Sequence, residues 1–415
     1  TINSFGNNSV RIYTDGTNSF TGNGTINVDG TGVIIFNISG TGSFNQNFNI
    51  TSTPGSSYAF GNIKNTTIYS NNSTTIGANG IYINGTNSAV LLGTNSSLTS
   101  LDSNVTGLAL NGGYIGGLPV TINSQALNQE ATNQGNISFG NNSTGIYVIN
   151  GASAENQGTI TLGDGSAGIY GNGAGSNVSN TGTITTGGAS AGMYLKDGDT
   201  MTNSGNIYGT QERTVGLYLE GITTSTVTNN GVIDLSGDKT LGIYTTGNGV
   251  QTINNTGTII VGYSSTELDP SVGIYNESDN NIINNSGNIT TGLDSIGIYN
   301  VGGTVNQIGG GLNIGAGGIG IYTDSGSMNL SGGTVNSNGA DTVGIYAING
   351  AAIDNNASLN ISDNSFGIVL NSGANLVNRN LSTLGNGGVA IYSDGGASIT
   401  NELGADITIT GSKSE

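Results

Sequence analysis

The chain has 415 residues, 74 of them Gly, and its 7 Lys and Arg against 25 Asp and Glu give a formal net charge of -18. It contains neither Cys nor His, which excludes disulfides, thiolate or imidazole metal sites and every catalytic mechanism that needs those side chains. The negative charge argues against nucleic acid as a partner, because phosphates would be repelled.

The composition predicts an ordered all-β protein. Charged residues make up 8% of the chain and hydrophobic residues 34%, which differs from the charge-rich composition of disordered proteins. Gly, Asn, Ser and Thr dominate the sequence, and all four are poor residues for a helix interior. No apolar run reaches the roughly 18 residues that a membrane-spanning helix needs, so we expect no membrane insertion by this segment.

Residues 1–79 hold strand-like pieces without a regular spacing. The stretch 32–38, with the sequence Gly-Val-Ile-Ile-Phe-Asn-Ile, is one example. We interpret residues 1–79 as degenerate rungs of the regular coil that is predicted for residues 80–415.

From residue 80 onward, a Gly-Ile-Tyr string recurs along the chain. From Gly145 to Ala390, most copies are 23 or 24 residues apart, and the longest step separates Gly242 from Gly273. Between the copies lies a second string, Asn-x-Gly-x-Ile, as in Asn180-Thr181-Gly182-Thr183-Ile184. Repetition at a fixed period of this length is typical of solenoid proteins.

One repeat divides into three short strands, at 215–219, 226–228 and 232–235, separated by turns rich in Gly and Asn. A single such unit cannot bury its apolar side, whereas stacked units can. The sequence therefore predicts a parallel β-helix of about 17 rungs, each with three strands and 23–24 residues. We expect a right-handed coil, because the turns vary in length and lack a strict hexapeptide rhythm.

Strand alternation predicts which residues face outward. The residue before each Gly and the Ile after it should face inward, while Gly and Tyr should face outward. The Tyr residues would then form an outer ladder that either covers strand backbone or stacks on carbohydrate; the remaining alternative places the rings in the core. The predicted ladder consists of Tyr170, Tyr194, Tyr218, Tyr244, Tyr275, Tyr299, Tyr322 and Tyr346. The repeated corner Asn residues should form a buried amide ladder from rung to rung.

Two intervals are longer than one repeat and predict inserted loops near 113–130 and 262–272. Loops on a rigid scaffold can carry a binding surface, and they are also sites where insertions are tolerated. The candidate binding residues are Tyr114, Gln125, Glu130, Tyr263, Glu267 and Asp269.

The ionisable side chains that the sequence does contain do not favour an enzyme. A glycosidase needs only two carboxylates, and Glu220 with Asp197, or Glu277 and Asp279 with an acid of an inserted loop, are possible sources. Scattered acids on a thin coil will, however, often approach each other by accident. A polysaccharide lyase would need a basic cluster, and the few Lys and Arg are dispersed. The tandem Gly-Gly-x-Gly-x-Asp motif of calcium-binding β-rolls is absent from the sequence. We therefore expect no catalytic residues, no metal and no cofactor.

The Gly-Ile-Tyr and Asn-x-Gly-x-Ile strings resemble the passenger domains of the large autotransporter adhesins of fusobacteria, clearly over about residues 80–400. The resemblance implies a passenger fragment exported by type V secretion and displayed at the bacterial cell surface. It also implies attachment to galactose-type host glycans, to a protein receptor or to partner bacteria. We expect the chain to be monomeric. The alternative function is a structural stalk that displays a distal binding tip.

Overall fold

The computed structural model of the protein describes residues 2–4, 10–16, 20–28, 33–52, 58–266, 269–380 and 382–409. All regular secondary structure in these residues is β-strand. Among them, no helix is present that is long and apolar enough to cross a membrane. Contacts between residues divide the chain into two units, Thr1–Tyr208 and Gly209–Glu415.

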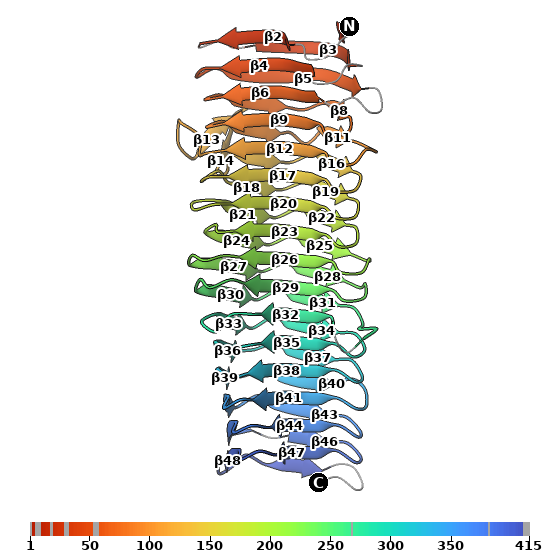
Figure 1. Cartoon of the computed structure of the whole chain (residues 1–415), viewed down its shortest axis with the longest axis vertical. Helices are drawn as coiled ribbons and strands as arrows, with labels where there is room; N and C mark the ends of the chain where they lie inside the picture. Colours follow the sequence, from red (N-terminus) through yellow and green to blue (C-terminus); the bar gives the residue numbers. More distant parts are fainter. Residues whose placement is uncertain are drawn as a thin grey trace. The chain divides into compact units, whose positions relative to one another are not determined.

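Each unit is a parallel β-solenoid with three strands in each regular turn (Figure 1). The first strands of successive turns run leftward across the front of Figure 1, the chain returns behind them to the right, and the turns descend, so each coil is right-handed. The predicted fold class is confirmed, with about 15 turns in the chain. Inserted loops account for part of the difference from the predicted 17, because they lengthen the chain without adding a turn.

In the first unit, strands stack in register in three columns. The first column contains β2 (Val10–Asp15), β4 (Val33–Ser39), β6 (Tyr58–Lys64), β9 (Ile81–Thr86), β12 (Thr106–Asn111), β17 (Thr144–Ile149), β20 (Ala167–Asn172) and β23 (Ala191–Lys196). The second contains β7 (Thr67–Ser70), β10 (Ala89–Leu92), β15 (Ala131–Asn133), β18 (Ala154–Asn156), β21 (Asn177–Asn180) and β24 (Thr200–Asn203). The third contains β8 (Ser73–Thr75), β11 (Ser97–Thr99), β16 (Asn136–Phe139), β19 (Thr159–Leu162), β22 (Thr183–Thr186) and β25 (Asn206–Gly209).

The turns nearest the N-terminus differ from those that follow. Alongside β1 (Ile2–Ser4), the strands β3 (Phe20–Val28) and β5 (Ser43–Ser52) are long. One end of β5 pairs with β7 and the other end with β8. A single strand therefore covers the span that later turns divide between two strands. The sequence of β5 has no Asn-x-Gly corner, which is the element that bends the chain in the later turns.

The second unit repeats the three columns. The first contains β26 (Val215–Glu220), β29 (Leu241–Thr246), β32 (Val272–Asn276), β35 (Ile296–Asn300), β38 (Ile319–Asp324), β41 (Val343–Ile348), β44 (Phe366–Leu370) and β47 (Val389–Ser393). The second contains β27 (Ser225–Asn229), β30 (Gln251–Asn255), β33 (Ile282–Asn285), β36 (Thr304–Gln307), β39 (Ser327–Leu330), β42 (Ala352–Asn355), β45 (Asn375–Asn378) and β48 (Ser398–Asn401). The third contains β28 (Val232–Leu235), β31 (Thr258–Val261), β34 (Asn288–Thr291), β37 (Gly311–Ile314), β40 (Thr334–Ser337), β43 (Ser358–Ile361), β46 (Ser382–Leu384) and β49 (Ile407–Ile409).

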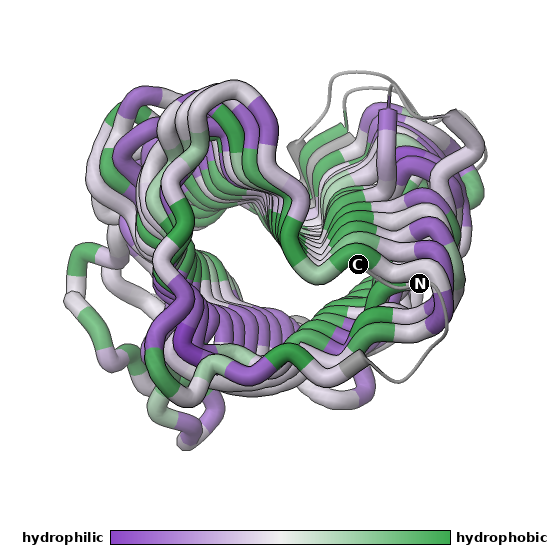
Figure 2. The backbone as a smooth tube through the Cα atoms, turned by 90° about the horizontal axis from the view of Figure 1, so that it is seen from below, coloured by the Kyte–Doolittle hydropathy of each residue, from purple (hydrophilic) through white to green (hydrophobic). Residues whose placement is uncertain are grey.

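The core of each unit is a set of stacked aliphatic side chains. In one turn, Ile243, Ile253 and Ile259 come from the three columns, and none of the three is exposed. Viewed along the coil, hydrophobic positions of successive turns within a unit follow one another as green bands (Figure 2). This stacking buries the apolar side that a single turn would leave open to water.

The amide ladder predicted at the corner is confirmed. In the first unit, the Asn133 side chain donates to Asn156 at 2.8 Å, Asn156 donates to Asn180 at 2.8 Å, and Asn180 donates to Asn203 at 2.8 Å. All four side chains are fully buried. The second unit has the same ladder at Asn229, Asn255 and Asn285, where Gln307 extends it.

The predicted orientation of the residue before Gly, and of Gly itself, is wrong. Where β29 pairs with β32, Leu241 pairs with Val272 and Ile243 with Ile274, whereas Gly242 has no paired residue in β32. Gly242 is buried, and a Cβ at this position would lie 2.4 Å from Cγ2 of the core residue Ile259. Two successive residues therefore face inward, and Leu241 lies half-buried on the outer face beside Tyr244. The regular alternation assumed from the sequence is interrupted at each such Gly.

The first Gly-Ile-Tyr copy is out of phase with the others. Thr106 pairs with Ile81, and Leu108 pairs with Ile83, so Tyr82 stands at the inward position that Gly occupies in later turns. Tyr82 is completely buried, and its hydroxyl lies 2.6 Å from Oγ of Ser70.

Candidate functional site

The tyrosines of the first column form stacked ladders on the outer face of each unit. In the first unit, the ring centroids of Tyr147, Tyr170 and Tyr194 lie 5.1 and 4.9 Å apart. In the second unit, the centroids of neighbouring rings are 4.6 to 5.5 Å apart. Its members are Tyr218, Tyr244, Tyr275, Tyr299, Tyr322 and Tyr346. These separations are those of favourable aromatic pairs.

The phenols in the middle of the second ladder are held in their neutral form. Burial, with Glu277 adding to it, raises the pKa of Tyr244 and Tyr275. Burial also raises the pKa of Tyr322 to about 12. The Tyr244 hydroxyl donates to Oε2 of Glu277 at 2.7 Å. The ladder therefore presents half-buried rings with neutral hydroxyl groups that can donate and accept hydrogen bonds.

A pocket of about 280 Å³ lies beside this ladder in the second unit. Outward-facing side chains of β29, β32 and β35 form most of its lining, and the loop after β31 supplies the rest. The lining residues are Leu241, Val272, Tyr275, Ile296, Tyr299, Asp269 and Pro270. The pocket exists because the residues before Gly face outward, which sequence alternation did not predict.

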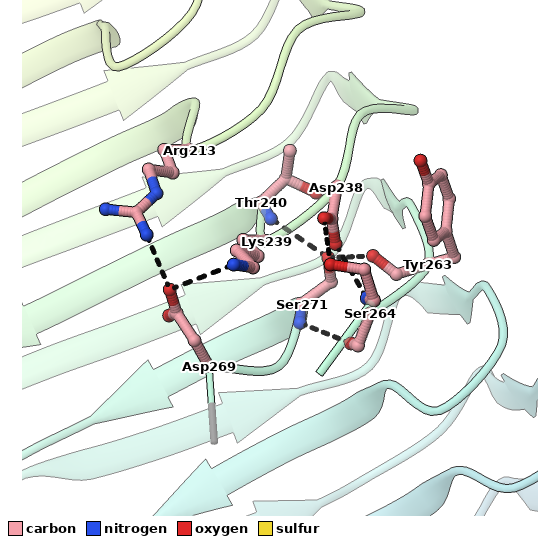
Figure 3. Close-up of polar contacts among 9 residues, drawn as sticks. Arg213, Asp238, Lys239, Thr240, Tyr263, Ser264, Asp269 and Ser271 are labelled. Carbon is pink, nitrogen blue, oxygen red and sulfur yellow. Dashed lines mark hydrogen bonds and ion pairs between the residues drawn. The ribbon is translucent and has the colours of Figure 1, made fainter. Parts of the chain in front are cut away.

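Hydrogen bonds fix the loop that borders the pocket (Figure 3). The Ser271 amide donates to Oγ of Ser264 at 2.7 Å, and the Ser271 hydroxyl donates to the Tyr263 carbonyl at 2.9 Å. The Thr240 amide donates to Oγ of Ser271 at 2.9 Å. The loop is thus anchored to the preceding turn close to the point where β32 begins.

Two cations meet the loop at Asp269 (Figure 3). Oδ2 of Asp269 lies 3.4 Å from Nη2 of Arg213 and 4.0 Å from Nζ of Lys239. The side chains of Arg213 and Asp269 are 59% and 54% exposed, whereas that of Lys239 is only 16% exposed. The nearby Asp238 accepts hydrogen bonds from Ser265, and these bonds hold the pKa of the Asp238 carboxyl below its ordinary value.

The candidate residues of the second insertion are therefore only partly brought together. Asp269 lies at the pocket, while the Tyr263 ring is 51% exposed on the same loop. Glu267 lies outside the described residues. Sequence reasoning did not select Arg213 and Lys239 as site residues. Each stands two residues before a strand of the Gly-Ile-Tyr type, and this shared position was the signal that could have identified them.

The first insertion folds back onto the coil. It forms a hairpin of β13 (Val120–Ile122) and β14 (Gln125–Leu127), which turns at Asn123 and Ser124. Its buried residues Val120, Ile122 and Leu127 pack with Ala89 and Leu91 of β10, next to Tyr69 and Tyr114. The apolar side chains of this loop therefore pack against the solenoid.

Two candidate residues of the first insertion have structural partners. Glu130 is 3% exposed and accepts hydrogen bonds from the amides of Tyr114 at 3.1 Å and Ser153 at 2.9 Å. Gln125 accepts a hydrogen bond from Gln134 at 2.8 Å. These contacts show Glu130 as an anchor of the loop, with its oxygens directed at the protein's own amides.

Carboxylates elsewhere are not arranged as a metal centre. Glu277 and Asp279 line a small pocket of about 140 Å³, where Glu277 is bound by Tyr244. Within the described ranges, no group of three or more acidic side chains is close enough to hold a metal ion.

No protein-family model, no curated protein and no solved structure matches this chain.

Proposed function

We propose that this chain is a surface adhesin segment that attaches a bacterium to host cells or to other bacteria by holding a glycan on the outer face of residues 209–415. The observation that carries the proposal is the 280 Å³ pocket walled by Tyr275 and Tyr299. Its volume is close to the lower end of the usual range for small-molecule sites, roughly 300 Å³, which suits about one sugar ring.

The pocket combines the two kinds of surface that a sugar presents. A pyranose has an apolar face of C–H groups, which can pack against the Tyr rings and against the half-buried Leu241. Its hydroxyl groups need hydrogen-bond partners, which the tyrosine hydroxyls and the Asp269 carboxylate offer. A galactose-type ring, with one strongly apolar face, suits such a surface.

The remaining features of the proposal follow from the resemblance to fusobacterial autotransporter adhesins. The chain would lie outside the cell as a passenger segment, with the solenoid holding the pocket away from the membrane. It would act as a monomer, because copies with a net charge of -18 repel one another. A protein receptor is the alternative partner for the same outer face.

The test is binding of the purified chain to galactose-terminated oligosaccharides and to epithelial cells, with free galactose or N-acetylgalactosamine as competitor. Tyr275→Ala and Tyr299→Ala should each weaken binding about tenfold, since an aromatic contact contributes roughly 1 kcal/mol or more. Tyr170→Ala is the matched control, because it removes a ladder ring from residues 1–208 and should leave binding unchanged. Saturable binding that survives both pocket variants would place the glycan elsewhere, and a folded chain that binds nothing would contradict the proposal.

The second candidate function is a stalk. The buried amide ladders within each unit favour it, because such a ladder ties successive turns together without providing a binding surface. In that case the surface variants would leave bacterial attachment unaffected, while deletion of whole turns would reduce it.

A further inference from the structure

We infer that the pocket beside the second tyrosine ladder recognises a sugar that carries a carboxylate, with Arg213 and Lys239 as its anion contacts. The inference rests on the proposed function, since it names the class of glycan that the same pocket would take. It is carried by the position of these two cations beside the pocket residue Asp269 and by the donors that they keep, among the described residues, beyond their contacts with Asp269.

The two cations are placed where the fold does not require them. Arg213 and Lys239 occupy the same corner in consecutive turns, two residues before β26 and β29, with φ angles of 58° and 56°. Uncharged or acidic residues hold this corner elsewhere with similar positive φ angles. They are Asn142, Ala189, Asp294, Asp341 and Asn364. Since the corner forms without a cation, its backbone conformation does not account for the charges of Arg213 and Lys239.

Among the described residues, both cations have few side-chain partners. A guanidinium has five N–H donors, and the contact of Arg213 with Asp269 is a single long one of 3.4 Å. The Lys239 side chain is only 16% exposed, yet its closest carboxylate oxygen among the described residues is 4.0 Å away. Both contacts go to the same oxygen of Asp269. A second carboxylate can therefore bind both cations with Asp269 still in place.

The cations border the pocket through Asp269, which belongs both to the pocket lining and to the ion pairs. A sugar ring seated against Tyr275 and Tyr299 would direct a substituent on that side toward Arg213. The planar guanidinium fork matches a carboxylate in two parallel hydrogen bonds, which a neutral hydroxymethyl group cannot accept.

The negative charge of the whole chain does not prevent this recognition. At physiological ionic strength, charges more than about 8 Å apart are largely screened, so acids in distant turns contribute little. Closer to the site, Asp238 is engaged with Ser265 by hydrogen bonds. The contact between a ligand carboxylate and the two cations is therefore decided locally, by the attraction of Arg213 and Lys239 against the repulsion of the single carboxylate of Asp269.

The test compares two ligands that differ only at C6. The full chain is titrated calorimetrically with galactose-terminated and galacturonate-terminated oligosaccharides of equal length, and with the methyl ester of the latter. We expect the galacturonate ligand to bind about tenfold more tightly than the galactose ligand, and esterification to remove the difference.

Variants assign the preference to the two cations. Arg213→Asn and Lys239→Asn should each reduce the ratio of galacturonate to galactose affinity to less than threefold. Asn is chosen because Asn142 and Asn364 hold the same corner with positive φ, and circular dichroism checks that the variants fold. Lys64→Asn, which removes an exposed cation from residues 1–208, is the matched control and should keep the full preference.

The outcomes separate this inference from the proposed function. Equal binding of the galactose and galacturonate ligands, or a preference that survives both Asn variants, would overturn the inference and leave the glycan-binding pocket standing. Failure of a folded chain to bind either ligand, or their cell-surface equivalents, would overturn both.

Discussion

Replacing Asn285 with Ala should destabilise the second unit far more than replacing its neighbour Asn284. Asn285 is fully buried at the corner of β33; its side chain donates to Oε1 of Gln307 at 2.8 Å and accepts from Asn255 at 2.7 Å. Alanine would leave one donor and one acceptor without partners inside the protein. Each stranded buried group costs about 1–3 kcal/mol, so the expected loss is about 2–6 kcal/mol.

Asn284 is the matched control, because it makes the same number of ladder bonds in the same strand. Its amide donates to Asn254 at 2.9 Å and accepts from Asn306 at 2.8 Å. Asn284 is half-buried on the outer face, so water can satisfy the partners that Ala would release. We therefore expect Asn284→Ala to cost less than about 1 kcal/mol.

The assay is guanidinium unfolding followed by circular dichroism and tyrosine fluorescence. Because the turns of a solenoid can open separately, hydrogen exchange of the amides of β30, β33 and β36 should accompany it as a local measure. Faster exchange confined to these strands is expected for Asn285→Ala. Equal destabilisation by the two variants would refute the argument that burial, and not the ladder bond itself, sets the cost.

Three further predictions concern the corner glycines, the phenols and the first insertion. Gly182→Ala should lower the unfolding midpoint, because a Cβ there would lie 2.1 Å from the Gly158 carbonyl oxygen of the preceding turn. Gly373→Ala is the control: its Cβ would meet no atom within 4 Å, but its φ is +77°, so it measures the cost of backbone strain without a clash. Raising the pH from 10 to 12 should lower stability, because tyrosines of the unfolded chain lose their phenolic protons near the ordinary pKa of 10.0, while the pKa of the folded chain's Tyr322 is raised to about 12. Urea midpoints that stay constant across this window would contradict the assigned burial. Glu130→Ala should release the loop that Glu130 binds through the Tyr114 amide, so that limited proteolysis cuts within 113–129 while the β-sheet circular dichroism is retained; unchanged protease resistance would show that the apolar hairpin contacts suffice.

The site was less predictable than the fold, as the glycines of the first column illustrate. Strand alternation correctly placed Ile243 in the core. It placed Gly242 outward and Leu241 inward, whereas the structure has the reverse. The reason is steric, since Ile259 from the third strand approaches so closely that only Gly fits opposite it, and the strand adapts by placing two residues inward in succession. The aliphatic lining of the pocket follows from this local irregularity.

Glu130 illustrates the same limit in a loop. From the sequence, a carboxylate in a long insertion is a candidate for ligand binding. In the structure it is buried and bound by backbone amides of Tyr114 and Ser153. No spacing rule relates a loop residue to the amides that it will meet in the next turn, so the sequence could not distinguish an anchor from a ligand contact.

The sequence by itself determined the solenoid, its three strands per turn and the buried amide ladder. These features repeat at a fixed spacing, and parallel in-register stacking brings each residue onto its own equivalent one turn later, as with Asn156 and Asn180. Only the tertiary structure decided that Arg213, Lys239 and Asp269 meet at the edge of an apolar pocket. That meeting depends on how an inserted loop of irregular length is folded and hydrogen-bonded against the coil, which no periodic pattern encodes.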